Sequence, residues 1–260
     1  MSTLAGIFAL IFARCFGATL FAPAIGGVEV SRSIRATVAL TTTALVFPIV
    51  VDSAFASAVS ASSGWANGGV LRFGVALGVE ALLGVALGLA LRLIFEGVYL
   101  AGETIARVGG ISVAGTFDPT LGEEISPISR FLFWLALVVF ATAGGFELFF
   151  EGVLDGFSRV EPGAAASAAG LIEGFAGILT VAFSLAIKLA APVLAATAAT
   201  YLATGVLGRL LPQLNLTAVG FNVAAFATLA VLSLSVGAFC SVFQTEIVSA
   251  LTTFFRVEPI

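Results

Sequence analysis

Long apolar runs, separated by short charged or glycine-rich stretches, fill the sequence. The apolar positions follow one another without the sustained alternation that a half-buried strand would need, so the pattern predicts helices. We therefore expect an all-α fold of about six long apolar helices, several of them arranged as bent hairpins, in a single domain over residues 1–260. The apolar runs cover residues 4–25, 36–51, 73–95, 131–146, 174–208 and 210–245.

Two of these runs are too long for one straight membrane-spanning helix. The last contains 36 residues without a charge, and at about 1.5 Å per residue such a helix would measure about 54 Å. The hydrocarbon core of a bilayer is only about 30 Å thick. We therefore expect Pro212 and the Asn215 region to start a new element, or the helix to continue beyond the lipid inside a protein complex. In the fifth run, Pro192 predicts a kink or a break because proline cannot donate the helical hydrogen bond.

The composition indicates that water is not the main environment of this chain. Hydrophobic residues make up 60% of the sequence and charged residues only 10%, and the mean hydropathy is +1.15. Soluble domains carry about 25% charged residues to cover their surface. The sequence therefore excludes a water-soluble globular enzyme and a disordered chain, and it predicts an integral membrane protein or a subunit buried in a hydrophobic assembly. The net charge of −4 gives no reason to expect a nucleic-acid partner.

The arrangements of residues that common catalytic sites use are missing from the sequence. The chain contains no histidine, which excludes histidine bases and histidine metal ligands. Its single lysine, Lys188, is not part of a phosphate-binding glycine-rich loop. The two cysteines, Cys15 and Cys240, lie in apolar runs and are too few for a metal knuckle or a disulfide framework. Ser112 has no histidine to activate it, and the acidic pair Glu123-Glu124 has no evident electrophilic partner. We therefore predict no enzyme activity, no cofactor and no metal.

A few charged residues lie inside the apolar runs. An unpaired charge at the centre of a bilayer costs about 2.5–3.5 kcal/mol, so Arg14 is expected to face protein, water or a carboxylate. Two interpretations of Arg14 stay open, namely a role at a pore or subunit contact and a structural ion pair. Glu80 and Lys188 are expected to pair or to extend toward the membrane surface.

Two glycine pairs, Gly74–Gly78 and Gly84–Gly88, lie in the third apolar run. Small residues four positions apart leave a flat surface on a helix, which lets the backbone of a second helix approach closely. The pairs therefore predict tight helix packing and give no indication of catalysis.

The stretch between residues 101 and 130 differs from the apolar runs around it. It begins with a helical pattern in which Glu103 and Arg107 are placed to pair at i and i+4. Three glycines, two hydroxyl residues and a proline then follow in residues 109–119, and this composition disfavours a helix. Irregular backbone at membrane depth survives only where protein buries it or where it lines a cavity. We therefore interpret this stretch as a re-entrant or pore-lining loop, and the alternative is an ordinary turn between helices.

Short features follow one another along the chain in a specific order. They are Arg14 and Pro23, the basic pair Arg32 and Arg35, Pro48, Ala101-Gly102-Glu103 with Gly110, Ser112 and Asp118-Pro119, then Pro192, residues 207–215 and Gly220-Phe221. In order and spacing these features resemble the FliR/SctT family, the export-gate subunits of flagellar and injectisome type III secretion. The chain departs from the family at Ser31 and Asn222, where proline is common, and at Val108-Gly109, where a Gln-Met pair is common.

The resemblance implies a fold like a fusion of the two smaller gate subunits, FliP and FliQ. It also implies that one copy completes a helical assembly of FliP-like and FliQ-like subunits in the bacterial inner membrane, within the flagellar basal body. FlhB-like and FlhA-like subunits are the further implied partners, and unfolded export substrates are the implied cargo. The implied pore plug consists of Arg107, Gly109, Gly110, Ile111, Ser112, Val113, Ala114, Gly115, Thr116, Phe117, Asp118 and Pro119. The residues with implied structural or interface roles are Arg14, Pro23, Glu103, Pro192, Arg209, Pro212, Gln213 and Gly220.

Three alternatives stay open. The same resemblance also fits the SctT subunit of a virulence injectisome. A stand-alone secondary transporter would need intramembrane polar sites and internal repeats, and the sequence shows only lone charges and no clear repeat. A structural membrane scaffold without a gating role is the third alternative.

Overall fold

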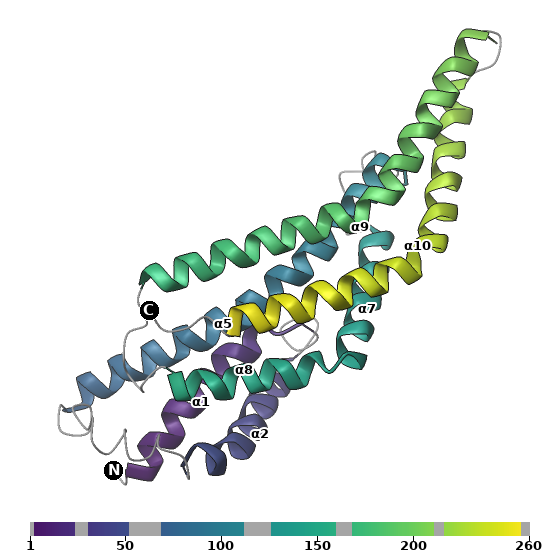
Figure 1. Cartoon of the computed structure of the whole chain (residues 1–260). Coiled ribbons are helices and arrows are strands. Elements are labelled where there is room, and N and C mark those ends of the chain that lie inside the picture. The colour runs from purple at the N-terminus through teal and green to yellow at the C-terminus, as the bar shows by residue number, and fades with distance from the viewer. Residues whose placement is uncertain are drawn as a thin grey trace. The chain divides into compact units, whose positions relative to one another are not determined.

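The computed structural model of the chain describes residues 3–23, 31–51, 69–111, 126–159, 168–210 and 216–255. The regular secondary structure of these residues is helical throughout, which confirms the predicted all-α fold (Figure 1). Seven helices occur in these ranges, against the expected number of about six. They are α1 (Thr3–Phe21), α2 (Arg32–Val51), α5 (Gly69–Val108), α7 (Pro127–Thr142), α8 (Gly145–Arg159), α9 (Ala168–Leu210) and α10 (Leu216–Phe255).

Several of these helices are suited to a membrane. Among the described residues, four helices are long and apolar enough to cross a bilayer, namely α1, α5, α9 and α10. A fifth crossing is formed if α7 and α8, which only Ala143 and Gly144 separate, act together as one broken span. The membrane class expected from the composition is therefore confirmed.

Some of the helix ends lie where the sequence predicted them. Helix α9 ends at Leu210 and α10 begins at Leu216, which confirms that a new element starts after the Pro212 region. Pro212 and Gln213 themselves lie outside the described residues. Pro192 does not break the fifth run, because α9 continues through it as one helix of 43 residues. Between α7 and α8, Gly144 has a φ of +75°, a left-handed conformation that glycine adopts without a Cβ clash.

Helix α5 is longer than the apolar run that predicted it. The run ends at Phe95, whereas the helix extends over 40 residues to Val108. The charged residues Glu96, Glu103 and Arg107 are therefore carried on the same helix as the apolar residues before them. This length places a polar helical segment directly before the loop that the sequence analysis identified.

The chain divides into two compact units. Unit 1 contains residues 1–93, 144–179 and 248–260, and unit 2 contains residues 94–143 and 180–247. The long helices α5, α9 and α10 each contribute residues to both units. The single export-gate domain over residues 1–260 stays a prediction.

In unit 1, helix α1 packs closely against the first half of α5. A Cβ added at Gly84 would overlap the backbone of Arg14, and one at Gly88 would overlap the backbone of Ala18. From the other side, a Cβ at Gly17 would lie 2.5 Å from the carbonyl oxygen of Ala81. The close packing predicted for Gly84–Gly88 is therefore confirmed. A Cβ at Gly74 or Gly78, by contrast, would meet no described atom within 4 Å.

In unit 2, the core is built around Phe95 on α5. Its ring centroid lies 5.7 Å from that of Phe133, 5.5 Å from that of Phe140 and 5.6 Å from that of Phe243, all edge to face. Such aromatic pairs stabilise a core beyond the area that they bury. Phe95 thereby connects α5 to both α7 and α10, and it fixes how α5 is rotated within the unit.

Candidate functional site

The charged residue in the first apolar run has a carboxylate partner. Arg14 Nε donates to Glu80 Oε2 over 2.6 Å, and the two side chains are 1% and 0% exposed. The Arg14 guanidinium also lies 4.1 Å from the ring centroid of Phe157. Arg14 therefore joins α1 to α5 and α8 within unit 1. Because both partners are buried, the structure favours a structural ion pair over a direct role at a pore surface.

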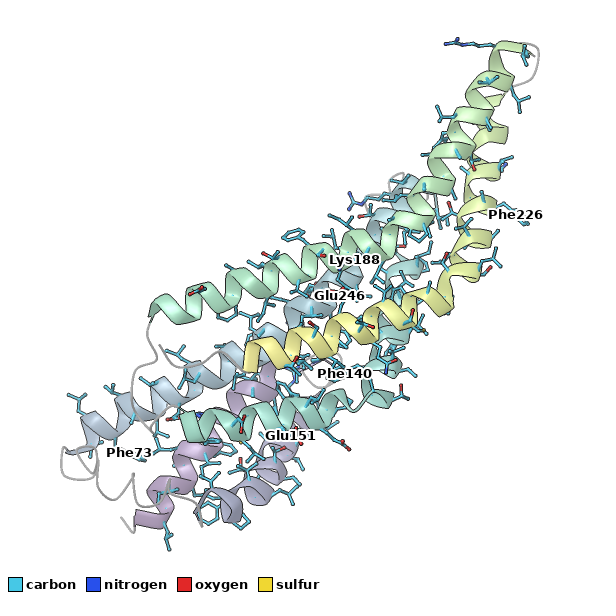
Figure 2. The ribbon with its side chains drawn as sticks, viewed as in Figure 1. Phe73, Phe140, Glu151, Lys188, Phe226 and Glu246 are labelled. Atoms are coloured by element: carbon cyan, nitrogen blue, oxygen red, sulfur yellow. The ribbon has the colours of Figure 1, made fainter. Side chains whose placement is uncertain are left out.

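A second ion pair connects α9 to α10 in unit 2. Lys188 Nζ lies 2.5 Å from Glu246 Oε1, and the two side chains are 49% and 26% exposed (Figure 2). The expectation that Lys188 pairs is thus confirmed. Its exposed position, in a span that is otherwise apolar, means that this part of the surface is unsuited to lipid tails.

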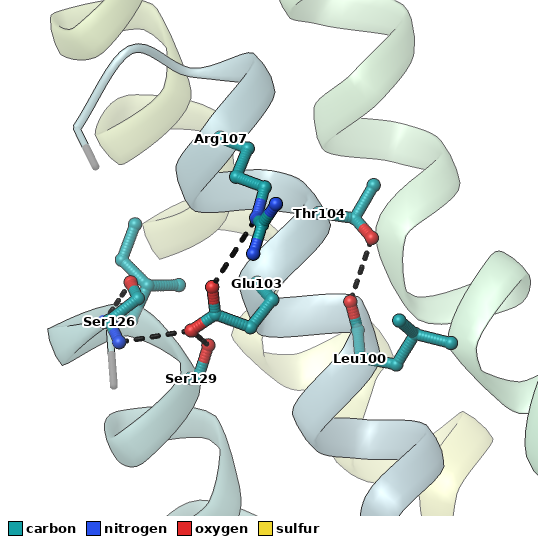
Figure 3. A network of polar contacts seen from close by, with 7 residues as sticks. Leu100, Glu103, Thr104, Arg107, Ser126 and Ser129 are labelled. Atoms are coloured by element: carbon teal, nitrogen blue, oxygen red, sulfur yellow. Dashed lines mark hydrogen bonds and ion pairs between the residues drawn. The ribbon is translucent and has the colours of Figure 1, made fainter. Parts of the chain in front are cut away.

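Glu103 joins the end of α5 to the start of α7. Its Oε1 accepts one hydrogen bond from the backbone N–H of Ser126 and one from the hydroxyl of Ser129, both at 2.9 Å (Figure 3). Ser126 is the N-cap of α7, and its hydroxyl accepts from the N–H of Ile128 over 3.2 Å. A carboxylate at a helix N-terminus is favourable because it meets unpaired N–H groups and the positive end of the helix dipole.

The predicted pair of Glu103 and Arg107 is confirmed, but it is the weaker of the contacts that Glu103 makes. Arg107 Nε lies 3.7 Å from Glu103 Oε2, and the Arg107 side chain is 76% exposed. An exposed pair of this kind contributes only about 0.3–0.5 kcal/mol on a helix. The two shorter bonds of Glu103 to Ser126 and Ser129 therefore hold α7, while Arg107 extends outward.

The C-terminal end of α5 has a defined cap. The N–H of Ile111 donates to the carbonyl of Ala106 over 3.0 Å, and the N–H of Gly110 donates to the carbonyl of Arg107 over 3.2 Å. Gly110 has a φ of +74°. These features are a Schellman motif, in which glycine takes the left-handed position after the helix. The prediction that the glycine-rich stretch ends the helix is therefore confirmed.

Helices α9 and α10 also hold this end of α5. The hydroxyl of Tyr201 on α9 donates to the carbonyl of Val108 over 2.7 Å. A Cβ at Gly109 would lie 2.6 Å from Thr228 Oγ1 on α10, so Gly109 permits a contact that a larger residue would block. With Glu103 bonded to α7, the last two turns of α5 are fixed by all three other helices of unit 2.

The structure describes only part of the residues predicted to form the plug and the interfaces. Arg107, Gly109, Gly110 and Ile111 lie at the end of α5, whereas residues 112–119 lie outside the described ranges. The remaining predicted positions fall on several elements. Pro23 is buried just after α1, Pro192 and Arg209 are exposed on α9, and Gly220 is buried on α10, where a Cβ would lie 3.9 Å from Thr204.

Four residues that contact the end of α5 or cap α7 were not predicted from the sequence, namely Ser126, Ser129, Tyr201 and Thr228. A signal was present for Ser126, because serine followed by proline is typical of a helix N-cap and first turn. The other three contacts depend on the tertiary arrangement and leave no local pattern. Among the described residues, no three potential metal-ligating side chains come together. Arginine, lysine, serine or backbone N–H groups engage the carboxylates of Glu80, Glu103 and Glu246.

We expect replacement of Glu103 by alanine to lower the free energy of unfolding by about 1.5–3 kcal/mol, because hydrogen bonds to a charged group contribute that much. Glu103→Gln keeps an acceptor oxygen for Ser126 and Ser129, so its loss should be clearly smaller. Denaturation in detergent of the protein, purified within the assembly that covers its apolar surface, measures both. Thr104→Ala is the matched control, because the Thr104 hydroxyl bonds only the Leu100 carbonyl of its own helix. Equal stability of Glu103→Ala and the control would contradict the role of Glu103.

The exposed faces of unit 2 are strongly apolar along α9 and α10. Large exposed apolar side chains there include Phe183, Ile187, Leu202, Val206, Phe226, Leu229 and Leu234. The apolar part of α9 covers Glu173–Leu210, which is 38 residues and about 57 Å of helix. This length of helix is well above the thickness of the hydrocarbon core, which is about 30 Å. Part of its apolar surface therefore requires a cover other than lipid.

The chain matches the family model described as bacterial export proteins, family 1, over residues 5–250. It is also similar to several proteins named flagellar biosynthetic protein FliR. The relative from Caulobacter vibrioides is 28% identical over 234 residues, which are 87% of each chain. The Escherichia coli relative is 27% identical over 184 residues, 70% of each chain. The Bacillus subtilis relative is 31% identical over 145 residues, which are 54% of this chain and 56% of the relative.

Proposed function

The chain belongs to the bacterial export proteins, family 1, and from this membership we propose that it is a membrane-embedded subunit of the flagellar type III export apparatus. In this proposal it forms the protein-conducting export gate together with FliP-like and FliQ-like subunits. Unfolded export substrates pass through the gate, and FlhB-like and FlhA-like subunits are further partners. The assembly lies in the bacterial inner membrane, within the flagellar basal body.

The observation that carries the proposal is the apolar surface that lipid cannot cover. The apolar part of α9 exceeds the thickness of a bilayer, and large apolar side chains such as Leu202 and Phe226 are exposed on α9 and α10. Apolar surface that extends beyond the hydrocarbon core would face water unless another protein covers it, so the excess length indicates a protein interface. Apolar helices of neighbouring subunits would cover this surface, because apolar helices pack against one another through close van der Waals contacts.

We further propose that the loop beginning at the end of α5 is the plug of the closed channel, over Arg107 and residues 109–119. The arrangement of its base supports this role. Gly109 and Gly110 follow a helix end that α7, α9 and α10 hold in place through Ser126, Tyr201 and Thr228. A loop on a fixed base can change conformation without separating the helices, and glycines lower the steric cost of that change.

Deletion of residues 109–116 is expected to raise the ion conductance of reconstituted gate complexes, because it removes the segment that closes the channel. The measurement is the leak current across planar bilayers or the collapse of an ion gradient in proteoliposomes. Co-purification with the FliP-like and FliQ-like subunits must be retained, so that a failure to assemble is not mistaken for an effect on closure. Gly78→Ala is the control with unchanged conductance, because its added Cβ would meet no described atom within 4 Å. An assembled deletion variant that conducts like the native complex would overturn the plug assignment.

The equivalent subunit of a virulence injectisome is the second candidate function. The two systems differ in the cargo that they export and share the gate chemistry described above. Loss of this chain should abolish swimming and the secretion of hook and filament proteins if the system is flagellar. Loss of effector secretion with normal swimming would favour the injectisome.

A further inference from the structure

A small cavity lies between α7, α9 and α10 in unit 2. Its volume is about 40 Å³, and much of its wall is apolar, since Leu132, Val193 and Phe239 line it and are buried. Two other lining residues differ from this wall. Pro192 contributes a break in the hydrogen-bonding pattern of α9, and Ser235 contributes a hydroxyl from α10. We call this space the Pro192 cavity.

Pro192 changes the backbone of α9 at this cavity. The helix continues through Pro192, but proline has no backbone N–H and cannot donate to the carbonyl four residues before it. That carbonyl belongs to Lys188, which lines the same cavity. In a membrane helix, the carbonyl that a proline frees is satisfied by a hydroxyl side chain, a neighbouring helix or an ordered water. The Pro192 cavity therefore borders a backbone acceptor that lacks its usual helical donor.

Ser235 provides a polar group on the α10 side of the Pro192 cavity. Two other serines of α10 donate within their own helix, Ser233 to the carbonyl of Ala230 and Ser241 to the carbonyl of Ala238. A water molecule needs about 10–15 Å³ of such a cavity and at least two polar partners. The Pro192 cavity offers about 40 Å³, together with the Lys188 carbonyl and the Ser235 hydroxyl. It therefore meets both conditions.

We infer that the Pro192 cavity is a hydration site, in which ordered water bridges α9 and α10. The water donates to the carbonyl of Lys188 and accepts from the hydroxyl of Ser235. The side chain of Lys188 also forms the ion pair with Glu246 on α10 (Figure 2). Lys188 thus joins the two helices twice, through its side chain and through its backbone. These polar contacts fix how α9 is placed along α10, which apolar packing alone specifies less sharply. The inference concerns unit 2 itself and goes beyond the proposed function.

Substitutions at Ser235 test the inference in the protein purified within the assembly that covers its apolar surface. Ser235→Thr keeps a hydroxyl, whereas Ser235→Val has a similar volume without one. Pulse proteolysis measures the unfolding of this chain, because its band is separated from the other subunits on a gel. We expect the unfolding equilibrium constant of Ser235→Val to exceed that of Ser235→Thr at least about fivefold, because the bridge to the carbonyl of Lys188 is lost.

Two further variants show whether this difference comes from the bridge. Ser233→Ala is the matched control, because the Ser233 hydroxyl donates to its own helix, and it should change the constant less than about twofold. Pro192→Ala returns an N–H that can donate to the Lys188 carbonyl directly. In this background the difference between Ser235→Thr and Ser235→Val should fall below about twofold. Equal stability of these two variants in the native background, or a difference that Pro192→Ala leaves unchanged, would overturn the inference.

Cryo-electron microscopy of the native assembly, at a resolution that shows ordered water, locates the bridge directly and does not depend on the folding of any variant. The expected result is water density between the carbonyl of Lys188 and the hydroxyl of Ser235. A dry cavity, or one that a lipid chain or an apolar side chain of a companion subunit fills, would overturn the inference.

Discussion

Replacement of Gly84 by alanine is expected to unfold or strongly destabilise unit 1. The added Cβ would overlap the carbonyl group of Arg14 on α1. The atoms in its way are backbone atoms, so no side chain can move aside and α1 must separate from α5. Overpacking of a core costs about 1–3 kcal/mol and more where backbone must shift. The displacement would also weaken the ion pair of Arg14 with Glu80, so we expect a loss of at least about 3 kcal/mol.

Gly78→Ala is the matched control on the same helix. A Cβ at Gly78 would meet no described atom within 4 Å, and replacing glycine by alanine in a helix raises its stability by up to about 1 kcal/mol. The two substitutions are therefore expected to change the free energy of unfolding in opposite directions. Denaturation of both variants in the complex co-purified with the FliP-like and FliQ-like subunits, followed by far-UV circular dichroism, measures the difference. Equal effects of Gly84→Ala and Gly78→Ala would contradict the close approach of α1 and α5.

Breaking the buried ion pair of unit 1 is expected to have an effect of similar size. Arg14→Leu leaves the carboxylate of Glu80 buried without its guanidinium partner, and Glu80→Leu leaves the guanidinium buried without its carboxylate. Removing one partner of a buried pair costs about 3–5 kcal/mol, because the remaining charge is uncompensated. Both single variants should therefore be poorly folded, and secretion should fail with them.

The double variant Arg14→Leu with Glu80→Leu separates pairing from packing. Replacing both members of a buried pair by apolar residues of similar size is often neutral or even stabilising. We expect the double variant to be clearly more stable than either single variant, and a double-mutant cycle measures this coupling. Lys188→Leu removes one partner of the exposed ion pair with Glu246. We expect this variant to lower the free energy of unfolding less than Arg14→Leu does. Additive losses in the double variant would mean that Arg14 and Glu80 are not coupled.

The sequence predicted features that depend on local pattern. Continuous apolar runs predicted helices, and the composition predicted a membrane protein. The spacing of Glu103 and Arg107 predicted their ion pair. The Pro212 region indicated a break, and α9 and α10 are separate helices. Each of these predictions depends on residues that lie close together in the sequence, so it can be made without knowing the tertiary fold.

Other features required the tertiary arrangement. The two glycine pairs of α5 look alike in the sequence. Among the described residues, however, Gly84 and Gly88 meet the backbone of α1, whereas Gly74 and Gly78 meet no atom within 4 Å. Arg14 and Glu80 are 66 residues apart, and no pattern connects them before the helices are placed. Pro192 was predicted to kink or break its helix, and the helix continues through it to Leu210. The stretch from residue 101 was predicted to begin as a helix, but that prediction did not show that it continues the helix of the preceding apolar run, which extends unbroken to Val108, where a Schellman motif ends it.

Co-expression and purification test the central claim that this chain is a gate subunit whose apolar surface is covered by companion subunits. The chain should be purified alone and together with the FliP-like and FliQ-like proteins of the same organism, and the products should be compared by size-exclusion chromatography with mass measurement. We predict that the chain aggregates when it is produced alone and elutes as a defined hetero-oligomer when its companions are present. A chain that is monodisperse on its own, and that elutes apart from the FliP-like and FliQ-like proteins, would contradict the account.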